Sequence, residues 1–324
     1  MTKNISSNSH SSMVGENVKM LREQIEKEKD KIISEKLLSA DEASAEEFKA
    51  AQKAGWNGVA SGWRKWWPMF EDGAQRLSDR LVELAEIKPY HRVLDIATGI
   101  GEPALTAAKK MGPNGRVIGT DISSEMVTIA RERVKEVGLD TIAIFEDIDA
   151  ESYTYPSSSF NAVTSRWGLM FLPNLTPTLQ KIRASLVPDG ILSAAVWSVP
   201  DKAPVLMLAF RTAAQKIGLP SPRAGSPGPF KLADIVTLEN SFIEAGFRNI
   251  KIETINLRFR FNSANDFVNF HKAINAPIHG MLKNQLIEKQ EEVWKGIADA
   301  VKTYYDNTGA ISLDNEVICV SGQR

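Results

Sequence analysis

Two periodicities of hydrophobic residues alternate along the middle of this chain. Short apolar runs rich in Val, Ile and Leu have the length and composition of buried strands, at 92–98, 116–121, 141–145, 160–165 and 190–197. Segments with apolar residues at helical spacing lie between them, at 102–111, 123–138 and 175–186. Strands that alternate with helices of this length predict βαβ units, and therefore a parallel sheet with right-handed crossovers.

The last third of the chain follows a different pattern, in which helical segments outnumber strands. Helices are predicted at 203–217, 231–245, 264–286 and 288–305, and strands at 249–261 and 316–321. Gly246 provides a C-cap for the second of these helices. The segment 219–230 is rich in proline and glycine, so we expect it to be a loop.

A polar stretch and a charged helical pattern open the chain. Residues 1–13 are rich in serine and asparagine and predict disorder. Residues 14–38 contain many lysines and glutamates, with apolar residues at helical spacing, and predict a solvated amphipathic helix. Such a helix usually has no site on it, although it could serve a partner or a homodimer.

Two further helices are predicted before the first strand. Ser39 and Glu42 form a capping-box pattern, which begins a helix that continues to about Gly55. The next helix is predicted from about Asp72 to Glu86, ending before Pro89.

Composition excludes several classes of protein. The chain has 324 residues, of which 43% are hydrophobic, and this is enough to bury a large core. Its 39 basic and 40 acidic residues leave a net charge of −1, which disfavours a nucleic-acid binder or an acidic disordered chain. The single cysteine, Cys319, excludes an intramolecular disulfide and fits a cytoplasmic location. We also expect no membrane span and no signal peptide, because apolar runs such as 203–210 are short.

A glycine-rich turn is predicted between the first strand and the helix that follows it. Gly99, Gly101 and Ala104 match the G-x-G-x-x-G/A pattern, in which glycines permit a tight turn and close backbone approach to a ligand. The free N–H groups of the following helix face the same point. This pattern alone is weak, since a merely tight turn would produce it as well.

Three acids strengthen the interpretation of a ligand site. Asp95 ends the first strand, Asp121 ends the second strand, and Asp149 follows the third. Open α/β sheets bind ligands at the carboxyl ends of their strands, so these acids would lie together there. An acid in the position of Asp121 can accept both hydroxyls of a ribose. Asp95 would repel a pyrophosphate but would suit a cationic amino group.

The combined motifs resemble those of Rossmann-type (class I) S-adenosylmethionine-dependent methyltransferases, and are most similar to the UbiE-like group of small-molecule methyltransferases. The resemblance spans about residues 90–198 and is carried by VLDIATGIGEPALTAA, VIGTDISSEMVTIARERV, DAESYTYPSSSFNAV, RWGLMFLPN and LVPDGIL. It implies an α/β fold with a doubly wound, mostly parallel seven-stranded sheet whose last strand is antiparallel, with N-terminal helices and helical lid insertions.

The resemblance also implies a division of the chain into two parts. Residues 1–40 would be a flexible tail and charged helix, and 41–324 a single methyltransferase domain. Within that domain we expect N-terminal helices, a cofactor-binding core and two helical lid segments, at 41–88, 89–198, 199–247 and 262–310.

The resemblance assigns cofactor-binding roles residue by residue. The ribose hydroxyls would bind Asp121, and the adenine amino group would bind Asp149 beside Ala150. Ser165 and Arg166 would lie next to the methyl-donor end, where Arg166 could pair with a carboxylate of cofactor or acceptor, or with a surface acid. The adenine ring would contact Ile122 and Met126. The residues that would hold the methionine moiety are Asp95, Thr98, Gly99 and Gly101.

Three motifs depart from the pattern of the family. The UbiE-type quinone enzymes have a Tyr-Asp-x-Met-Asn pattern before the core, and here Trp63 stands where that tyrosine does. This change puts a quinone acceptor in doubt. The Pro-Asp-Gly at 188–190 and the Phe-Asn at 160–161 also differ from the usual Pro-Gly-Gly and Phe-Asp, and leave the expected fold intact.

The candidate acceptor site is aromatic. Trp63, Trp66, Trp67 and Phe70 share one helical face, which is either an interior packing stripe or a lid over an apolar acceptor. Trp167, after the fourth strand, is a further candidate for substrate binding, and the helices of the last third would complete the lid. His271 could remove a proton from the acceptor, although a histidine on such a helix is more often a polar surface or core residue. No metal-binding motif and no nucleophile elbow occur.

These observations predict transfer of methyl from S-adenosylmethionine to a small, partly apolar acceptor, leaving S-adenosylhomocysteine. The reaction would be an in-line displacement at carbon or oxygen, for which the sequence names no base. Two alternatives remain open: a non-catalytic protein that binds the cofactor, and an NAD-dependent dehydrogenase, against which Asp95 and Asp149 count. A nucleic-acid acceptor is not expected, because Ser-Arg-Trp-Gly at 165–168 replaces the Asn/Asp-Pro-Pro-Tyr/Phe pattern of base-modifying enzymes.

Overall fold

The computed structural model describes the backbone of residues 8–219 and 228–324, and the side chains from Ser44 onwards. The chain divides into two compact units, 1–51 and 52–324, of which the second contains the sheet and the candidate site. The predicted disordered tail lies outside the described residues up to residue 7, and the predicted loop at 219–230 does so for residues 220–227.

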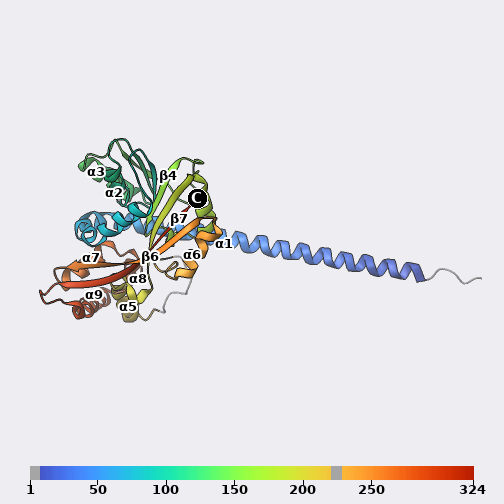
Figure 1. Ribbon diagram of the computed structural model, residues 1–324. Coiled ribbons are helices and arrows are strands. Elements are labelled where there is room, and N and C mark those ends of the chain that lie inside the picture. The colour runs from blue at the N-terminus through green and yellow to red at the C-terminus, as the bar shows by residue number, and fades with distance from the viewer. Residues whose placement is uncertain (1–7, 220–227) are drawn as a thin grey trace, which may run out of the picture. The chain divides into compact units, whose positions relative to one another are not determined.

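One seven-stranded sheet forms the centre of the second unit (Figure 1). Its strand order is β3-β2-β1-β4-β5-β7-β6, in which β1 to β5 are mutually parallel and β7 is antiparallel to both its neighbours. This confirms the predicted fold class. The strands are β1 (Arg92–Ile96), β2 (Arg116–Asp121), β3 (Ala143–Asp147), β4 (Phe160–Arg166), β5 (Leu186–Trp197), β6 (Arg248–Phe261) and β7 (Ile311–Gln323).

Helices cover both faces of the sheet. Val93 of β1 belongs to the apolar core beneath α2 (Ala104–Met111) and α3 (Ser124–Glu136). Leu94, on the other face, belongs to the core beneath α4 (Leu175–Ser185) and α6 (Ile235–Glu244). Successive side chains of a strand point to opposite faces, so the mostly apolar runs of the sequence follow from this double cover.

The N-terminal helices are continuous, which corrects the prediction of separate segments. Helix α1 runs over Asn8–Leu84 and includes Pro68, with no break near Gly55 or before Asp72. Proline removes one backbone hydrogen bond in a helix, but Pro68 lies on the exposed side. On the opposite side Phe70, Ala74, Leu77 and Leu81 are buried at helical spacing, and this burial outweighs the local cost.

β6 and β7 extend beyond the rest of the sheet. β7 pairs with β5 only over 317–323, whereas it pairs with β6 down to Ile311. The two strands therefore continue as a ribbon past Trp197, at the edge where β1 to β5 have their carboxyl ends. The last strand is accordingly longer than the predicted range of 316–321.

Four helices pack with this ribbon and with one another, and we call them the cap. Figure 1 shows them gathered at one end of β6 and β7. The predicted helix at 264–286 is in fact two helices, because the Asn275 side chain caps a new helix by accepting from the backbone N–H of Ile278. The cap helices are α5 (Pro204–Ile217), α7 (Ala264–Ile274), α8 (Ala276–Leu282) and α9 (Ile287–Val301). Short 3₁₀ helices complete the described fold, at Leu169–Phe171 (η1), Pro200–Lys202 (η2) and Lys302–Tyr304 (η3).

Candidate functional site

Asp95 ties the end of β1 to the beginning of α2. Its carboxylate is fully buried and accepts hydrogen bonds from the Thr164 hydroxyl at 2.6 Å and from the Ala104 backbone N–H at 3.2 Å. Thr164 is its register partner on β4. One carboxylate thus connects two strands and the first turn of a helix at the edge where the strands end.

The turn between β1 and α2 has an unusual backbone. Ala97, Gly99 and Gly101 have φ values of +54°, +56° and +105°, so every second residue of the turn is in a region that favours glycine. A Cβ at Gly99 would meet no atom within 4 Å, which leaves open space beside that backbone. Ala97 was missed by the sequence analysis, although its even spacing from the two glycines is a signal that could have found it.

Asp121 holds this turn from the neighbouring strand. Its two carboxylate oxygens accept from the backbone N–H of Gly99 at 2.8 Å and of Ser123 at 2.9 Å. Ser123 is in turn the N-cap of α3 and accepts from the Met126 N–H at 3.2 Å. Met126 is buried and Ile122 half-buried, so an apolar surface adjoins the acid.

Burial raises the pKa of both acids. The pKa of Asp95 rises to about 7, because desolvation outweighs the hydrogen bond from Thr164. The pKa of Asp121 rises to about 6, because desolvation outweighs the hydrogen bonds from Ser123 and Gly99. A ligand that brought a positive charge or hydroxyl donors to these carboxylates would favour their ionised forms.

The third acid, Asp149, lies on the same edge of the sheet. The backbone N–H of Ile148 donates to the Asp121 carbonyl at 2.9 Å, which holds the end of β3 against the end of β2. Asp149 is half-buried and accepts from the Glu151 N–H at 2.9 Å. Ala150 is half-buried as well, and its carbonyl accepts from the Tyr155 hydroxyl at 2.9 Å.

Two predicted residues at the end of β4 contact the protein itself. The buried Ser165 hydroxyl donates to the Ile96 carbonyl at 3.0 Å, beside the glycine-rich turn. The Arg166 guanidinium is also buried and donates to both carboxylate oxygens of Glu71 at 3.0 Å, and to the Ser78 hydroxyl at 2.7 Å. Glu71 therefore already provides Arg166 with a carboxylate, and pairing with a ligand stays a prediction.

The predicted aromatic residues form one cluster. Phe70 is its centre and contacts Trp63 at 4.9 Å and Trp167 at 5.5 Å between ring centroids. Trp167 also stacks on Trp197 at 4.7 Å, and its φ of +59° is rare for a bulky residue. Trp63 and Trp167 are half-buried, so part of each ring remains accessible.

His271 is unsuited to the predicted role of a base. It is completely buried on α7, and burial lowers its pKa to about 3. The Asn275 oxygen accepts from Ile278, so the Asn275 amide nitrogen donates to Nδ1 of His271, at 3.1 Å. The lone pair of Nδ1 is then occupied and the proton of the neutral ring lies on Nε2. In this arrangement His271 is a neutral donor.

Arg133 is a site residue that the sequence analysis missed. From α3 it donates to the carbonyl of Ile100 in the glycine-rich turn, and its guanidinium lies 3.6 Å from Glu102. Asn57 of α1 was missed too, and accepts from the Ser123 hydroxyl at 2.6 Å. Neither contact has a local sequence signal, because each joins elements that are far apart in the chain.

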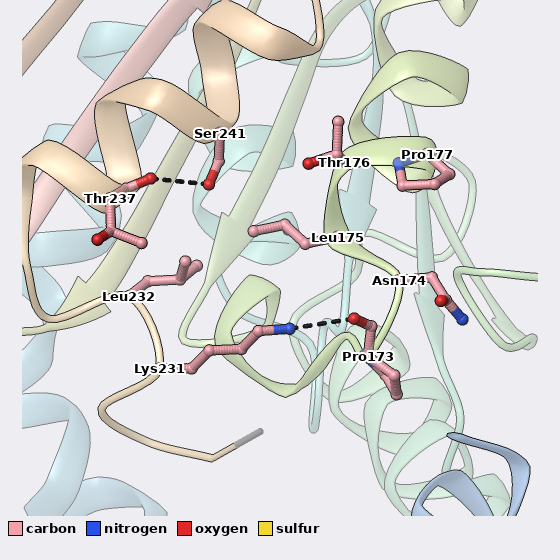
Figure 2. A pocket seen from close by; sticks show the side chains of 9 residues that line it. All are labelled: Pro173, Asn174, Leu175, Thr176, Pro177, Lys231, Leu232, Thr237 and Ser241. Atoms are coloured by element: carbon pink, nitrogen blue, oxygen red, sulfur yellow. Dashed lines mark hydrogen bonds between the residues drawn. The ribbon is translucent and has the colours of Figure 1, made fainter. Parts of the chain in front are cut away.

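A separate hollow of about 430 Å³ lies between the beginning of α4 and α6 (Figure 2). Lys231 closes one side of it by donating to the carbonyls of Leu172 at 2.5 Å and Pro173 at 3.2 Å. None of its lining residues is among those predicted to bind the cofactor. Within the described part of the chain, no group of three or more metal-binding side chains occurs, and no helix has both the length and the apolar composition of a membrane span.

Comparison with known proteins agrees with this geometry. A family model described as a methyltransferase domain matches residues 93–190. The chain is 35% identical over 127 residues to the ubiquinone/menaquinone biosynthesis C-methyltransferase UbiE of Hydrogenovibrio crunogenus, which is 39% of this chain and 50% of that protein. It is 32% identical over 136 residues to UbiE of Pseudomonas fluorescens Pf0-1, which is 42% of this chain and 53% of that protein. The chain therefore spans about half the length of these relatives.

Solved structures share the fold at low sequence identity. The YcgJ protein of Bacillus subtilis has a TM-score of 0.52 at 19% identity, over 77% of this chain and 98% of that one. A protein described as a putative methyltransferase from Bacillus halodurans has a TM-score of 0.50 at 19% identity, over 76% of this chain and 97% of that one. The likeness covers about three quarters of this chain, which is more than the part matched by the family model.

Proposed function

From the premise that residues 93–190 are a class I methyltransferase domain, we propose that the protein binds S-adenosylmethionine and transfers its methyl group to a small, partly apolar acceptor. The main observation behind this proposal is that Asp121 holds the glycine-rich turn in place. This acid binds the Gly99 N–H and stands at the end of the strand next to β1, where a ribose would meet it.

The residues at this edge fit the chemistry of the cofactor. Asp95 and Asp121 are buried acids with raised pKa values, so a ligand ammonium and ribose hydroxyls would satisfy them. The open space beside Gly99 admits a ligand close to the backbone. Asp149 and the apolar Ile122 and Met126 would hold the adenine on the other side of Asp121. When bound, the cofactor supplies a methyl group on a positively charged sulfur.

The chain's own contribution to the reaction would be alignment and the exclusion of water. The aromatic cluster around Phe70 lies next to the end of β4, and it provides an apolar surface for the acceptor. His271 is completely buried and its Nδ1 lone pair accepts from the Asn275 amide, so it does not supply a base. We therefore favour an acceptor that is nucleophilic without one, such as an enolate or a phenolate, methylated at carbon or oxygen.

Calorimetry with S-adenosylhomocysteine tests the cofactor site. Asp121→Ala should weaken binding about a hundredfold, because two hydrogen bonds from the ribose hydroxyls to a charged carboxylate are lost. Asp147→Ala is a matched control, since Asp147 is the register partner of Asp121 on β3 and is exposed. Equal affinity of the Asp121 variant and the wild type would refute the ribose assignment.

Incubation with methyl-labelled S-adenosylmethionine and host extract tests the activity. Label in the organic-soluble fraction, absent with Asp121→Ala, would support a small acceptor. Label in protein or nucleic acid would overturn that part of the proposal. Cofactor binding without transfer to any fraction would favour the alternative of a non-catalytic cofactor-binding protein.

A further inference from the structure

Three indole N–H groups in the aromatic cluster have no hydrogen-bond partner among the described residues. They belong to Trp63 and Trp66 on α1 and to Trp167 after β4, and each nitrogen is enclosed. Trp56, on the same helix, shows the usual arrangement, because its N–H donates to Gln52 at 3.1 Å. An indole can only donate, so each of the three nitrogens needs an oxygen or another acceptor. Buried donors without partners are rare in native proteins and call for an explanation.

The three tryptophans are connected through two phenylalanines. Phe70 contacts both Trp63 and Trp167, and lies 6.2 Å from Phe270, which in turn contacts Trp66 at 5.9 Å. The tryptophans are half-buried, whereas Phe70 and Phe270 are buried. The three tryptophans therefore belong to one apolar region, in which their rings remain partly accessible.

This region adjoins the candidate cofactor site. Trp167 is followed by Gly168, where an added Cβ would come within 2.5 Å of the Ala97 side chain in the glycine-rich turn. Ser165, two residues before Trp167, donates to Ile96 in the strand that leads into that turn. A molecule among the three indoles would lie next to the turn that holds the cofactor.

Two cationic side chains lie beside the tryptophan rings. Arg166 lies 5.2 Å from the Trp167 ring, and its carboxylate partner is Glu71. Lys65 lies 5.8 Å from the Trp66 ring. A cationic acceptor would meet these two cations, whereas an oxygen atom with free lone pairs would meet indole N–H groups.

We propose that Trp63, Trp66 and Trp167 donate hydrogen bonds to oxygen atoms of the acceptor, which is an apolar ring compound bearing carbonyl, ether or phenolate oxygens and no positive charge. The inference rests on the proposed function and deepens it, because it names the class of acceptor. It excludes amines as acceptors and agrees with methylation at carbon or oxygen.

Three probes with one carbon skeleton test the proposal. Tetralin, 1-tetralone and 1-aminotetralin differ only by a hydrogen, a carbonyl oxygen or an ammonium group at one carbon. Their affinities are measured by quenching of tryptophan fluorescence, with S-adenosylhomocysteine present so that no turnover occurs. We expect 1-tetralone to bind at least about fivefold more tightly than the other two, as one hydrogen bond from a buried donor implies.

Replacing tryptophan by phenylalanine removes the N–H and keeps an aromatic ring. Trp63→Phe, Trp66→Phe and Trp167→Phe together should reduce the preference for 1-tetralone to parity, and at least one of the single variants should reduce it alone. Trp56→Phe is the matched control and should retain the preference, because the Trp56 N–H is bound by Gln52.

Two outcomes would overturn the proposal. One is that the wild type binds 1-tetralone no better than tetralin, or binds none of the probes. The other is that the preference survives in all the variants, in which case the unpartnered N–H groups serve packing alone. Separate calorimetry with S-adenosylhomocysteine distinguishes these results from failure of the proposed function, because it reports on the cofactor site without any acceptor.

Discussion

The guanidinium of Arg133 lies 4.4 Å from the centroid of the Trp67 ring. This cation–π contact joins α3 to α1, and the same guanidinium donates to Ile100 in the glycine-rich turn. Arg166 lies 5.3 Å from the same Trp67 ring. The helix that carries the aromatic cluster is therefore coupled through Trp67 to the turn that would hold the cofactor.

We predict that Arg133→Met weakens binding of S-adenosylhomocysteine about tenfold, because the turn loses a hydrogen bond from a charged group. Glu102 would also be left buried without its cation. Arg64→Met is the control, since Arg64 pairs with Glu136 at the surface of the same two helices. Calorimetry measures both affinities. An unchanged affinity in a variant with a lower melting temperature would show that Arg133 supports folding alone.

Gly62 marks a close contact between α1 and the cap. A Cβ at this position would lie 2.0 Å from the Ala273 carbonyl oxygen on α7, so the two backbones are in direct contact. Gly62→Ala should lower the free energy of unfolding by about 3 kcal/mol or more, as expected where backbone must move. Gly58→Ala is the control, because an added Cβ there meets nothing within 4 Å. It should raise stability by about 0.5–1 kcal/mol. Urea unfolding measures both, and similar effects of the two variants would contradict the packing argument.

Ala97 is a position where replacement by glycine should not destabilise the protein. Its φ of +54° costs an alanine about 1 kcal/mol or more, which glycine avoids at the expense of greater freedom in the unfolded chain. Ala97→Gly should therefore leave stability unchanged or raise it by up to about 1 kcal/mol. Ala54→Gly, at an exposed position in the interior of α1, should lower it by about 1 kcal/mol. If both variants lost stability equally, the strain inferred at Ala97 would be absent.

The sheet and much of its ligand-binding edge could be predicted because their signals are local. β2 begins and ends at the predicted residues, 116 and 121, and the order and direction of the seven strands agree with the resemblance. Asp121 contacts Gly99 and Asp95 contacts Ala104 at one edge, because the carboxyl ends of adjacent parallel strands share an edge. Patterns in short segments determine all of these features.

Features that depend on distant contacts could not be predicted in this way. Arg166 pairs with Glu71, which is 95 positions away, and Arg133 reaches back 33 positions to Ile100. Helix α1 continues through Gly55 and Pro68 because a buried face outweighs local propensity. The neutral state of His271 depends on Asn275 and on complete burial, neither of which is visible in the sequence around a histidine.

The state of His271 leads to a kinetic prediction. Burial holds its pKa near 3, so this side chain does not titrate around neutral pH. His271→Gln should therefore leave the shape of the pH–rate profile of methyl transfer unchanged, even if it lowers stability by leaving a poorer fit among Phe267 and Phe270. Loss of a limb of that profile in the variant would identify His271 as a proton-transferring group and would refute the tautomer inferred from Asn275.

Asp121 makes the stability of the ligand-free protein depend on pH. Its folded pKa of about 6 lies above the ordinary value of 3.8 for an aspartate, so folding favours the protonated form. The stabilisation is complete below the unfolded pKa and is lost as the pH rises through the folded one. Relative to Asp121→Asn, the free energy of unfolding of the wild type should fall by about 1–1.5 kcal/mol between about pH 5 and about pH 8. Asp147→Asn, at the exposed register partner, should lose less stability than the wild type, because the charge of Asp147 adds to desolvation in raising the pKa of Asp121. Urea unfolding of the three proteins at both pH values measures this, and a constant difference between wild type and Asp121→Asn would show that the carboxyl is ionised throughout.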